Sequence, residues 1–239
     1  MKISTLRIPN MFFIALLILI EILFKANPKA GFFAYIVFLL GSIFYLLYQK
    51  MDDYITFLLI IPVLRIAVTS FNIEPALQIF FVSFIMLTMI LIKLNFSEHN
   101  ILRFGFNLKH IETLTQRPGL IYILIIICLG IGSLAGIMAK SFISLPAFSD
   151  LLLFSVMFVS VVEEFYFRGI LMTLNNKISR VLLIPFLYTA LVFEGSFAFA
   201  LIAFIFNLFA CGLFYKYKTI YLPMLAHMAL GIFLVVPKF

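Results

Sequence analysis

Long apolar runs constrain this chain more than any other feature of its sequence. Of its 239 residues, 65% are hydrophobic and 11% are charged, against roughly a half and a quarter in a soluble domain. This excess excludes a soluble globular protein, a disordered chain and a disulfide scaffold. Nine stretches approach the roughly 20 residues that a helix needs to cross about 30 Å of hydrocarbon: 8–24, 30–48, 54–71, 75–94, 120–138, 148–173, 181–197, 198–215 and 220–236.

The length of these stretches predicts an all-α fold, a polytopic transmembrane helix bundle with eight or nine spans. Strands of a membrane barrel need only about 10 residues, so the runs are too long for that alternative. The number of spans depends on the break near 194–197. The first stretch resembles a signal peptide, but Glu21 interrupts it and no small-residue cleavage site follows, so we interpret it as an uncleaved span.

The longest polar stretch divides the chain into three parts. We predict a four-span membrane region at 1–94, a basic cytoplasmic loop at 95–119 and a membrane core at 120–239. In the core, Gly132 and Gly136 form a G-x-x-x-G pattern, which permits close helix packing within the chain or between two copies. The sequence leaves the oligomeric state open.

Basic residues predict the orientation of the bundle. The net charge is +7, but the Lys and Arg residues lie in short loops, which is typical of topology determinants and not of a nucleic-acid-binding surface. With the N-terminus inside, the inner segments hold Lys2, Arg7, Lys50, Lys93, Arg103, Lys109, Arg117, Lys177, Arg180, Lys216 and Lys218, and the outer segments hold Lys25, Lys29, Lys140 and Lys238. Because cytoplasmic loops carry the excess of basic residues, we expect a cytoplasmic N-terminus.

Charged residues inside the predicted spans are rare, and each costs about 2.5–3.5 kcal/mol near the bilayer centre on insertion scales. Glu21 and Arg65 are single charges, which either reach toward an interface or pair with each other. Glu163, Glu164 and Arg168 fall within six positions of one span. The i,i+4 spacing of Glu164 and Arg168 lets one helical turn pair them. Glu163 is then left to take a proton from water and return it, unless the whole group is a structural cluster that joins helices.

His227 is the second polar site, because it is the only histidine within a predicted span. At 1.5 Å per residue, Glu163 lies about 15 Å and His227 about 10 Å from the inner ends of their spans. We therefore expect both side chains in one layer toward the cytoplasmic side, where an acid–base pair would share a pocket. A packing role for a lone intramembrane histidine is the alternative.

Other catalytic signatures are absent from the sequence. It contains no H-E-x-x-H, no G-x-S-x-G, no P-loop and no dinucleotide fingerprint. Cys128 and Cys211 lie inside apolar runs, and together with one intramembrane histidine they provide no ligand set for a protein-bound zinc ion. We therefore predict no cofactor site and no metal site.

The segment from Glu163 to Gly169 reads Glu-Glu-Phe-Tyr-Phe-Arg-Gly and resembles EExxFRG, the first motif of the CPBP family. This family, also called ABI, includes type II CAAX prenyl endopeptidases and bacteriocin-processing proteins. Phe206–Gly231, in which Pro223 precedes His227 by four residues, is similar to the family's closing segment. Phe104-Gly105-Phe106 is similar to its opening segment, so the resemblance covers about residues 100–236.

The resemblance implies an intramembrane protease of the glutamate type. Glu163 would activate the hydrolytic water, Glu164 and Arg168 would organise the helix, and His227 would help to bind the tetrahedral oxyanion. Base catalysis and oxyanion stabilisation are roles that these side chains allow.

Two positions depart from the family pattern. The second motif, Phe-x-x-x-His, is matched best by residues 193–197, where Phe197 stands in place of the histidine. Gly231 stands where the family has an asparagine as a second oxyanion donor. Glu194, close to the missing histidine, either substitutes as a polar group or lies at the outer membrane surface.

These observations leave three functional hypotheses. The first is an intramembrane endopeptidase that cuts a membrane-anchored or lipid-modified polypeptide. The second is a catalytically lapsed member of the family that binds a peptide or partner, as in bacteriocin self-immunity or protein sorting. The third is a proton-coupled transporter, which the absence of inverted repeats and of matching broken helices disfavours. All three are multi-pass integral membrane proteins, and we expect the membrane to be that of a bacterial cell.

Overall fold

The computed structural model describes residues 10–49, 53–70, 74–96, 101–106, 112, 115–116, 118–143, 147–174, 179–192 and 196–236. Within these ranges every regular element is helical, as predicted. The α-helices are α1 (Asn10–Ala26), α2 (Pro28–Gln49), α3 (Asp53–Leu58), α4 (Ile60–Ser70), α5 (Pro75–Phe96), α7 (Pro118–Ala139), α8 (Asp150–Glu164), α9 (Ser179–Val192), α10 (Phe197–Tyr217) and α11 (Tyr221–Val235). They are joined by a 3-10 turn, η1 (Ile101–Phe104), and by a π-helical segment, η2 (Phe165–Leu171).

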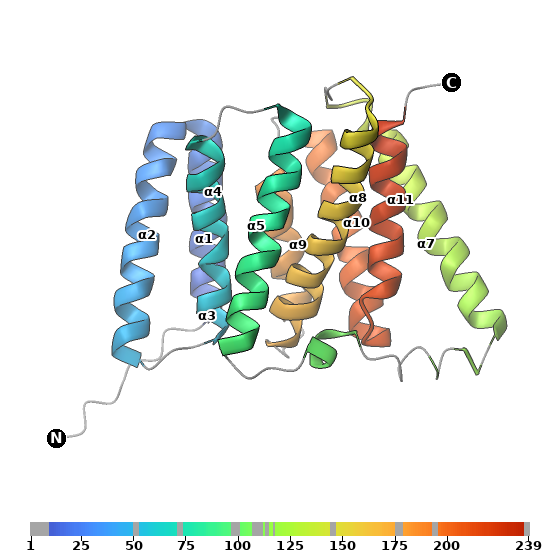
Figure 1. Ribbon diagram of the computed structural model, residues 1–239, viewed down its shortest axis with the longest axis horizontal. Helices are drawn as coiled ribbons and strands as arrows, with labels where there is room; N and C mark the ends of the chain where they lie inside the picture. The colour runs from blue at the N-terminus through green and yellow to red at the C-terminus, as the bar shows by residue number, and fades with distance from the viewer. Residues whose placement is uncertain are drawn as a thin grey trace.

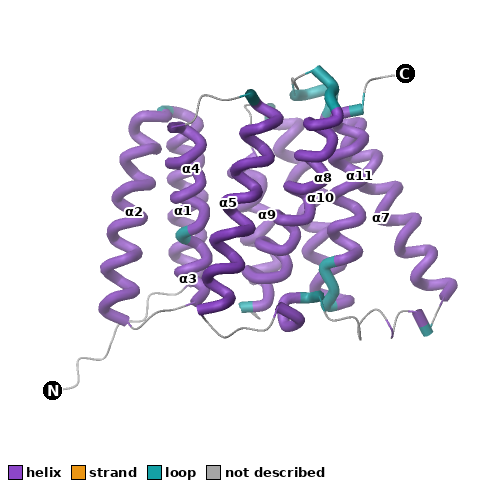
Figure 2. Tube along the Cα trace, in the orientation of Figure 1, coloured by secondary structure: helices purple, strands orange, loops and turns teal. Residues whose placement is uncertain are grey.

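The helices stand side by side and alternate in direction along the chain (Figure 1). In this view α1 begins at the lower end of the bundle and α11 finishes at the upper end. Figure 2 shows η1 as a short turn at the lower end, and it contacts η2. Each of the nine predicted apolar stretches corresponds to a helix, if α3 with α4 and α8 with η2 are each taken as one pass.

The pass formed by α3 and α4 contains an irregular turn at Leu59. Pro62 explains the break, because proline lacks an N–H and its ring clashes with the carbonyl group four residues earlier, that of Leu58. Hydrogen bonds from Leu59 N to Ile55 O at 3.1 Å and from Val63 N to Leu59 O at 3.3 Å carry the helix through the turn.

The packing of α7 against α11 depends on the glycines of the G-x-x-x-G pattern. A Cβ atom at Gly132 would collide with the carbonyl oxygen of Ala226, and one at Gly136 would collide with that of Leu230. The pattern therefore serves packing within the chain. Because His227 follows Ala226, the same contact fixes the height of this histidine in the bundle.

Glu21 and Arg65 form an ion pair between α1 and α4. Glu21 is fully buried, and the hydroxyl of Tyr35 on α2 donates a second hydrogen bond to its carboxylate. The Arg65 guanidinium also donates to the carbonyl oxygen of Leu191, which lies in the last turn of α9, where carbonyl groups have no partner within the helix. Pairing, one of the two alternatives from the sequence, is confirmed, and the pair ties the first helices to α9.

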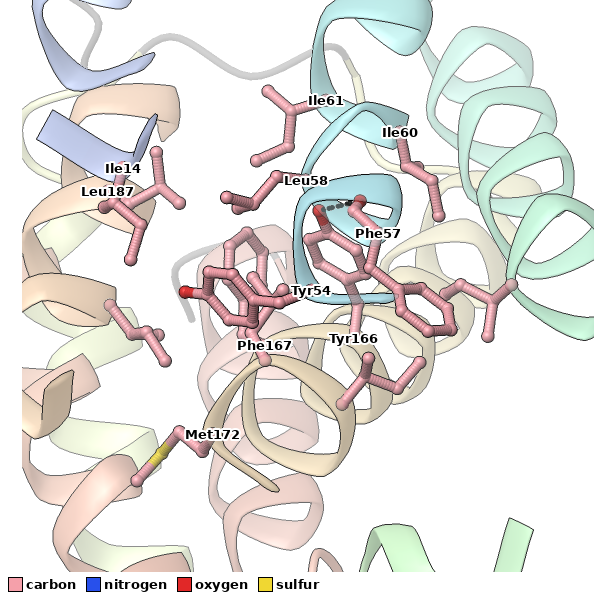
Figure 3. Close-up of a cluster of buried hydrophobic side chains, with 14 of the residues drawn as sticks. Ile14, Tyr54, Phe57, Leu58, Ile60, Ile61, Tyr166, Phe167, Met172 and Leu187 are labelled. Carbon is pink, nitrogen blue, oxygen red and sulfur yellow. Dashed lines mark hydrogen bonds between the residues drawn. The ribbon is translucent and has the colours of Figure 1, made fainter. Parts of the chain in front are cut away.

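A hydrophobic cluster joins the N-terminal helices to the second half of the bundle (Figure 3). Phe57 and Leu58 of α3 belong to the same cluster as Tyr166 and Phe167 of η2 and Leu187 of α9. The hydroxyl of Tyr166 donates to the carbonyl oxygen of Phe57 at 2.8 Å. The π-helical segment therefore packs against residues that lie more than a hundred positions earlier in the chain.

The outward-facing surface of the bundle is apolar, and large side chains such as Phe44, Leu47 and Ile126 are about two-thirds exposed or more. Among the residues that the structure describes, four helices are long and apolar enough to cross a membrane, by length and composition: Pro28–Tyr48, Pro75–Phe96, Pro118–Ala139 and Phe197–Tyr217. These are the features of an integral membrane protein. The total of eight or nine spans and the three-part division of the chain stay predictions.

Candidate active site

Glu163 and Glu164 lie in the last turn of α8, and Arg168 follows in η2. The helix widens here, since the N–H of Met172 bonds to the carbonyl oxygen of Phe167, five residues earlier. Short π-helical turns inside α-helices are frequent at functional sites. The charged motif predicted from the sequence thus lies where the regular backbone pattern changes.

Gly169 lets the segment around η1 approach this part of the helix closely. A Cβ atom at Gly169 would lie 2.8 Å from the carbonyl oxygen of Phe104. Gly105 has a φ of 90°, a conformation that glycine adopts without strain, and its carbonyl oxygen accepts a hydrogen bond from Ile220 N at 3.3 Å. The Phe104-Gly105-Phe106 segment therefore connects η2 to the beginning of α11.

The buried part of the site is an ion pair with two further polar partners. Oε1 of Glu164 is 3.0 Å from Nη1 of Arg168, and both side chains are fully buried. The same oxygen lies 2.9 Å from Nδ1 of His227 on α11. On the other side, the amide oxygen of Asn207 on α10 accepts a hydrogen bond from the guanidinium. The predicted i,i+4 pairing is confirmed, and each buried charge faces a partner that offsets its desolvation.

Glu163 lies on the more accessible side of this cluster. Its Oε2 atom is 3.7 Å from Nε2 of His227 and accepts a hydrogen bond at 2.7 Å from the hydroxyl of Tyr188 on α9. The Glu163 side chain is 21% exposed, whereas that of Glu164 is not exposed at all. The predicted proximity of Glu163 and His227 is confirmed, and Glu163 is the carboxylate of the pair that stays accessible.

Two residues of this cluster, Tyr188 and Asn207, were missed by reasoning from the sequence. Asn207 is the one amide side chain of α10 and lies in its apolar middle part, and its nitrogen donates to the carbonyl oxygen of Ala203 at 2.8 Å. A lone polar residue in a span usually faces the bundle interior, so this signal was present. Tyr188 gave no comparable signal, because the chain has ten tyrosines and many lie in apolar stretches.

The two departures from the family pattern have different structural surroundings. Phe197 is the first residue of α10 and is 80% exposed. A histidine at this position would therefore not point into the cluster as the helices are packed here. On the α9 side of the cluster, the side chain that contacts Glu163 is Tyr188. Gly231 lies against α8, where a Cβ atom would collide with Cγ1 of Val156. Glu194 lies outside the described residues.

The cluster has the parts of a general-base hydrolytic site. An accessible carboxylate can accept a proton from water, and an imidazole N–H beside it can stabilise a developing negative charge. Among the described residues, no group of three or more His, Cys, Asp and Glu side chains is arranged to hold a metal ion. The chemistry that these side chains support by themselves is acid–base chemistry.

Comparison with known proteins shows what the part of the chain that carries this cluster is similar to. Residues 145–233 match the family model of type II CAAX prenyl endopeptidase Rce1-like proteins. The match contains the four residues singled out from the sequence: Glu163, Glu164, Arg168 and His227. No curated protein and no solved structure matches the chain. The resemblance drawn from the sequence is therefore confirmed over residues 145–233, which are similar to the Rce1-like type II CAAX prenyl endopeptidases.

Proposed function

We propose that the protein is an intramembrane endopeptidase that hydrolyses a peptide bond of a membrane-anchored or lipid-modified polypeptide with water activated by Glu163. The observation that carries this proposal is the meeting of Glu163 and His227 from two different helices, with Oε2 and Nε2 3.7 Å apart. The matching family is one of CAAX prenyl endopeptidases. A polypeptide with a prenylated cysteine near its C-terminus is therefore the substrate class that we favour.

In the first step of the proposed reaction, Glu163 takes a proton from water while the water oxygen bonds to the carbonyl carbon of the substrate. The carbonyl oxygen becomes an oxyanion, and an N–H of His227 stabilises it. Fixed donors of this kind act most strongly where bulk water is excluded, and the His227 side chain is only 7% exposed.

In the second step, Glu163 gives the proton to the amide nitrogen of the substrate as the C–N bond breaks. The products are a carboxylate and an amine. Glu164 and Arg168 act indirectly, because the contact of Glu164 with Nδ1 at 2.9 Å orients the His227 ring so that Nε2 faces Glu163. The two adjacent glutamates thus have separate tasks.

Binding without catalysis is the second candidate function, and one observation favours it. The family pattern has a second oxyanion donor at the position of Gly231, and here Val156 fills the space that a side chain would need. In this alternative a catalytically lapsed protein binds a membrane peptide or partner, as in bacteriocin self-immunity or protein sorting.

A cleavage assay separates the two candidates. The full chain is reconstituted in liposomes with a fluorescent peptide that ends in a farnesylated Cys-a-a-X sequence, in water enriched in heavy oxygen. Hydrolysis predicts release of the terminal tripeptide and incorporation of one heavy oxygen atom into the new carboxylate of the prenylated product. Saturable peptide binding with no tripeptide release would favour the lapsed alternative.

We also propose that the N-terminus lies in the cytoplasm of a bacterial cell and that the chain crosses its membrane eight or nine times. Lys93, Lys216 and Lys218 lie at the ends of α5 and α10, on the side of the bundle where α1 begins, and cytoplasmic ends of membrane helices are rich in basic residues. A reporter fused after Lys218 is expected to read cytoplasmic and one near Lys140 external. Inversion of both signals would reverse the orientation.

A further inference from the structure

We propose that Tyr188 on α9 is a positioning residue of the site, whose hydroxyl links Glu163 to His227. The effect on rate rests on the proposed hydrolytic function, whereas the link itself rests on geometry alone. The hydroxyl donates to Oε2 of Glu163 at 2.7 Å and lies 3.3 Å from Nε2 of His227. One phenol group therefore bridges the two side chains that would act on the substrate.

The aromatic ring of Tyr188 is fixed from several sides. It packs edge to face on Phe167, with ring centroids 5.2 Å apart, and on His227 at 6.0 Å. The guanidinium carbon of Arg168 lies 5.5 Å from the ring centroid. Because the residue is 8% exposed, its hydroxyl finds its hydrogen-bond partners inside the cluster. The phenol is thus held in place before any substrate binds.

The hydroxyl has one proton to donate and lone pairs that accept. When it donates to Glu163, its oxygen can accept a hydrogen bond from an N–H at Nε2 of His227, until the substrate oxyanion replaces the phenol as the acceptor of that N–H. When Nε2 carries no proton, that nitrogen can accept the phenol proton instead. In the first arrangement Oε2 of Glu163 is occupied by Tyr188, which directs the other carboxylate oxygen, Oε1, to the water molecule. The Tyr188 hydroxyl therefore determines which carboxylate oxygen of Glu163 faces the hydrolytic water.

Contacts with the N-terminal helices hold α9 in the position from which Tyr188 reaches Glu163 and His227. Pro185 lies inside α9 and removes one of its backbone hydrogen bonds, which weakens the helix by itself. Arg65 of α4 bonds the carbonyl oxygen of Leu191, one turn beyond Tyr188, and Glu21 of α1 pairs with Arg65. Helices outside the family-matched region thus support the placement of Tyr188.

Kinetics of a matched pair of variants test the effect on rate. Tyr188→Phe removes one oxygen atom and keeps the ring contacts, so the unfolding temperature should stay close to that of the wild type. We expect kcat for the farnesylated peptide to fall roughly 10- to 100-fold, the factor expected for one hydrogen bond to a charged group, with KM unchanged. Tyr166→Phe is the control, because the Tyr166 hydroxyl is also buried but donates to the carbonyl oxygen of Phe57, which lies outside the site. A wild-type kcat in Tyr188→Phe, or an equal loss in both variants, would overturn the proposal.

A spectroscopic measurement tests the link without any activity. The chain has three histidines, so His99→Gln with His110→Gln leaves His227 as the only one for nitrogen-15 NMR. In this background, Tyr188→Phe is expected to shift the Nε2 resonance of His227, while Tyr166→Phe leaves it in place. An unchanged Nε2 resonance in Tyr188→Phe would overturn the link. If the wild type releases no peptide, the proposed function fails, and this measurement alone decides the role of Tyr188.

Discussion

Glu164 on α8 and His227 on α11 meet at 2.9 Å, between Oε1 and Nδ1, at the centre of the second half of the bundle. The carboxylate that holds the imidazole is fully buried and is itself paired with Arg168. Nε2, the other ring nitrogen, is therefore turned toward Glu163, which is the accessible member of the glutamate pair. A preorganised oxyanion donor requires a fixed ring, and here the free nitrogen lies on the accessible side of the cluster, beside Glu163.

Replacement of His227 tests its role as this donor. We predict that His227→Ala lowers kcat for the farnesylated peptide roughly 10²- to 10³-fold, the usual loss for one oxyanion donor. KM should change little, because the interaction forms mainly in the transition state. The chain stays folded, since Glu164 keeps its pairing with Arg168. Wild-type kcat in a folded His227→Ala protein would remove His227 from the mechanism.

The two intramembrane arginines are expected to differ in their effect on stability. Arg168→Ala should lower the free energy of unfolding by roughly 3–5 kcal/mol, because the buried carboxylate of Glu164 loses its cation. Arg65→Ala should cost less, because Arg65 is 21% exposed and Glu21 keeps its hydrogen bond from Tyr35. Unfolding temperatures in one detergent compare the two variants. A larger drop for Arg65→Ala would contradict this ranking.

The close contact between α7 and α11 predicts a position-specific effect of a single methyl group. Gly132→Ala should lower the unfolding temperature and kcat together, because its Cβ atom would push the backbone at Ala226 and displace the neighbouring His227. Gly130→Ala is the matched control: it lies two residues away on the same helix, and a Cβ atom there meets nothing within 4 Å. Equal effects of the two substitutions would show that this packing does not fix the site.

Restoring the family residues is expected to give no gain in turnover. Phe197→His should leave kcat unchanged, because Phe197 is 80% exposed at the beginning of α10. Gly231→Asn should lower the unfolding temperature, since its Cβ atom would collide with Val156, and Val156→Ala should partly relieve that loss. A rise in kcat for Gly231→Asn alone would contradict this prediction, because it would show that α8 can move away from α11 to make room for the asparagine.

Much of the fold follows from the sequence because a membrane leaves few choices. Apolar runs long enough to cross hydrocarbon must form helices, and each predicted run corresponds to one helix or to two consecutive helical segments. The pairing of Glu164 with Arg168 was also predictable, since their spacing lets them pair within one helical segment. The layer shared by Glu163 and His227 followed from counting residues along two antiparallel passes.

Contacts across the bundle were harder to predict, because nothing in an apolar run tells which face meets which neighbour. In the sequence, nothing distinguishes Tyr188 from the other aromatic residues. Its role becomes visible only in the structure, where α9 packs between α1 and α10. The sequence placed Phe197 at the end of the 181–197 stretch, whereas the structure makes it the first residue of α10. The π-helical turn at Arg168 likewise has no signature in the pattern of apolar residues.

The central claim is that Glu163 is the base, and the kcat of Glu163→Gln on the farnesylated peptide in liposomes tests it most directly. Glutamine keeps the shape of the side chain and an oxygen for the Tyr188 hydroxyl, but it does not accept the proton of water. We predict that kcat falls roughly 10²- to 10⁴-fold while the unfolding temperature stays unchanged. The control is Glu74→Gln, at an exposed residue before α5, which should keep the wild-type kcat. Cleavage by Glu163→Gln at the wild-type rate would contradict the claim.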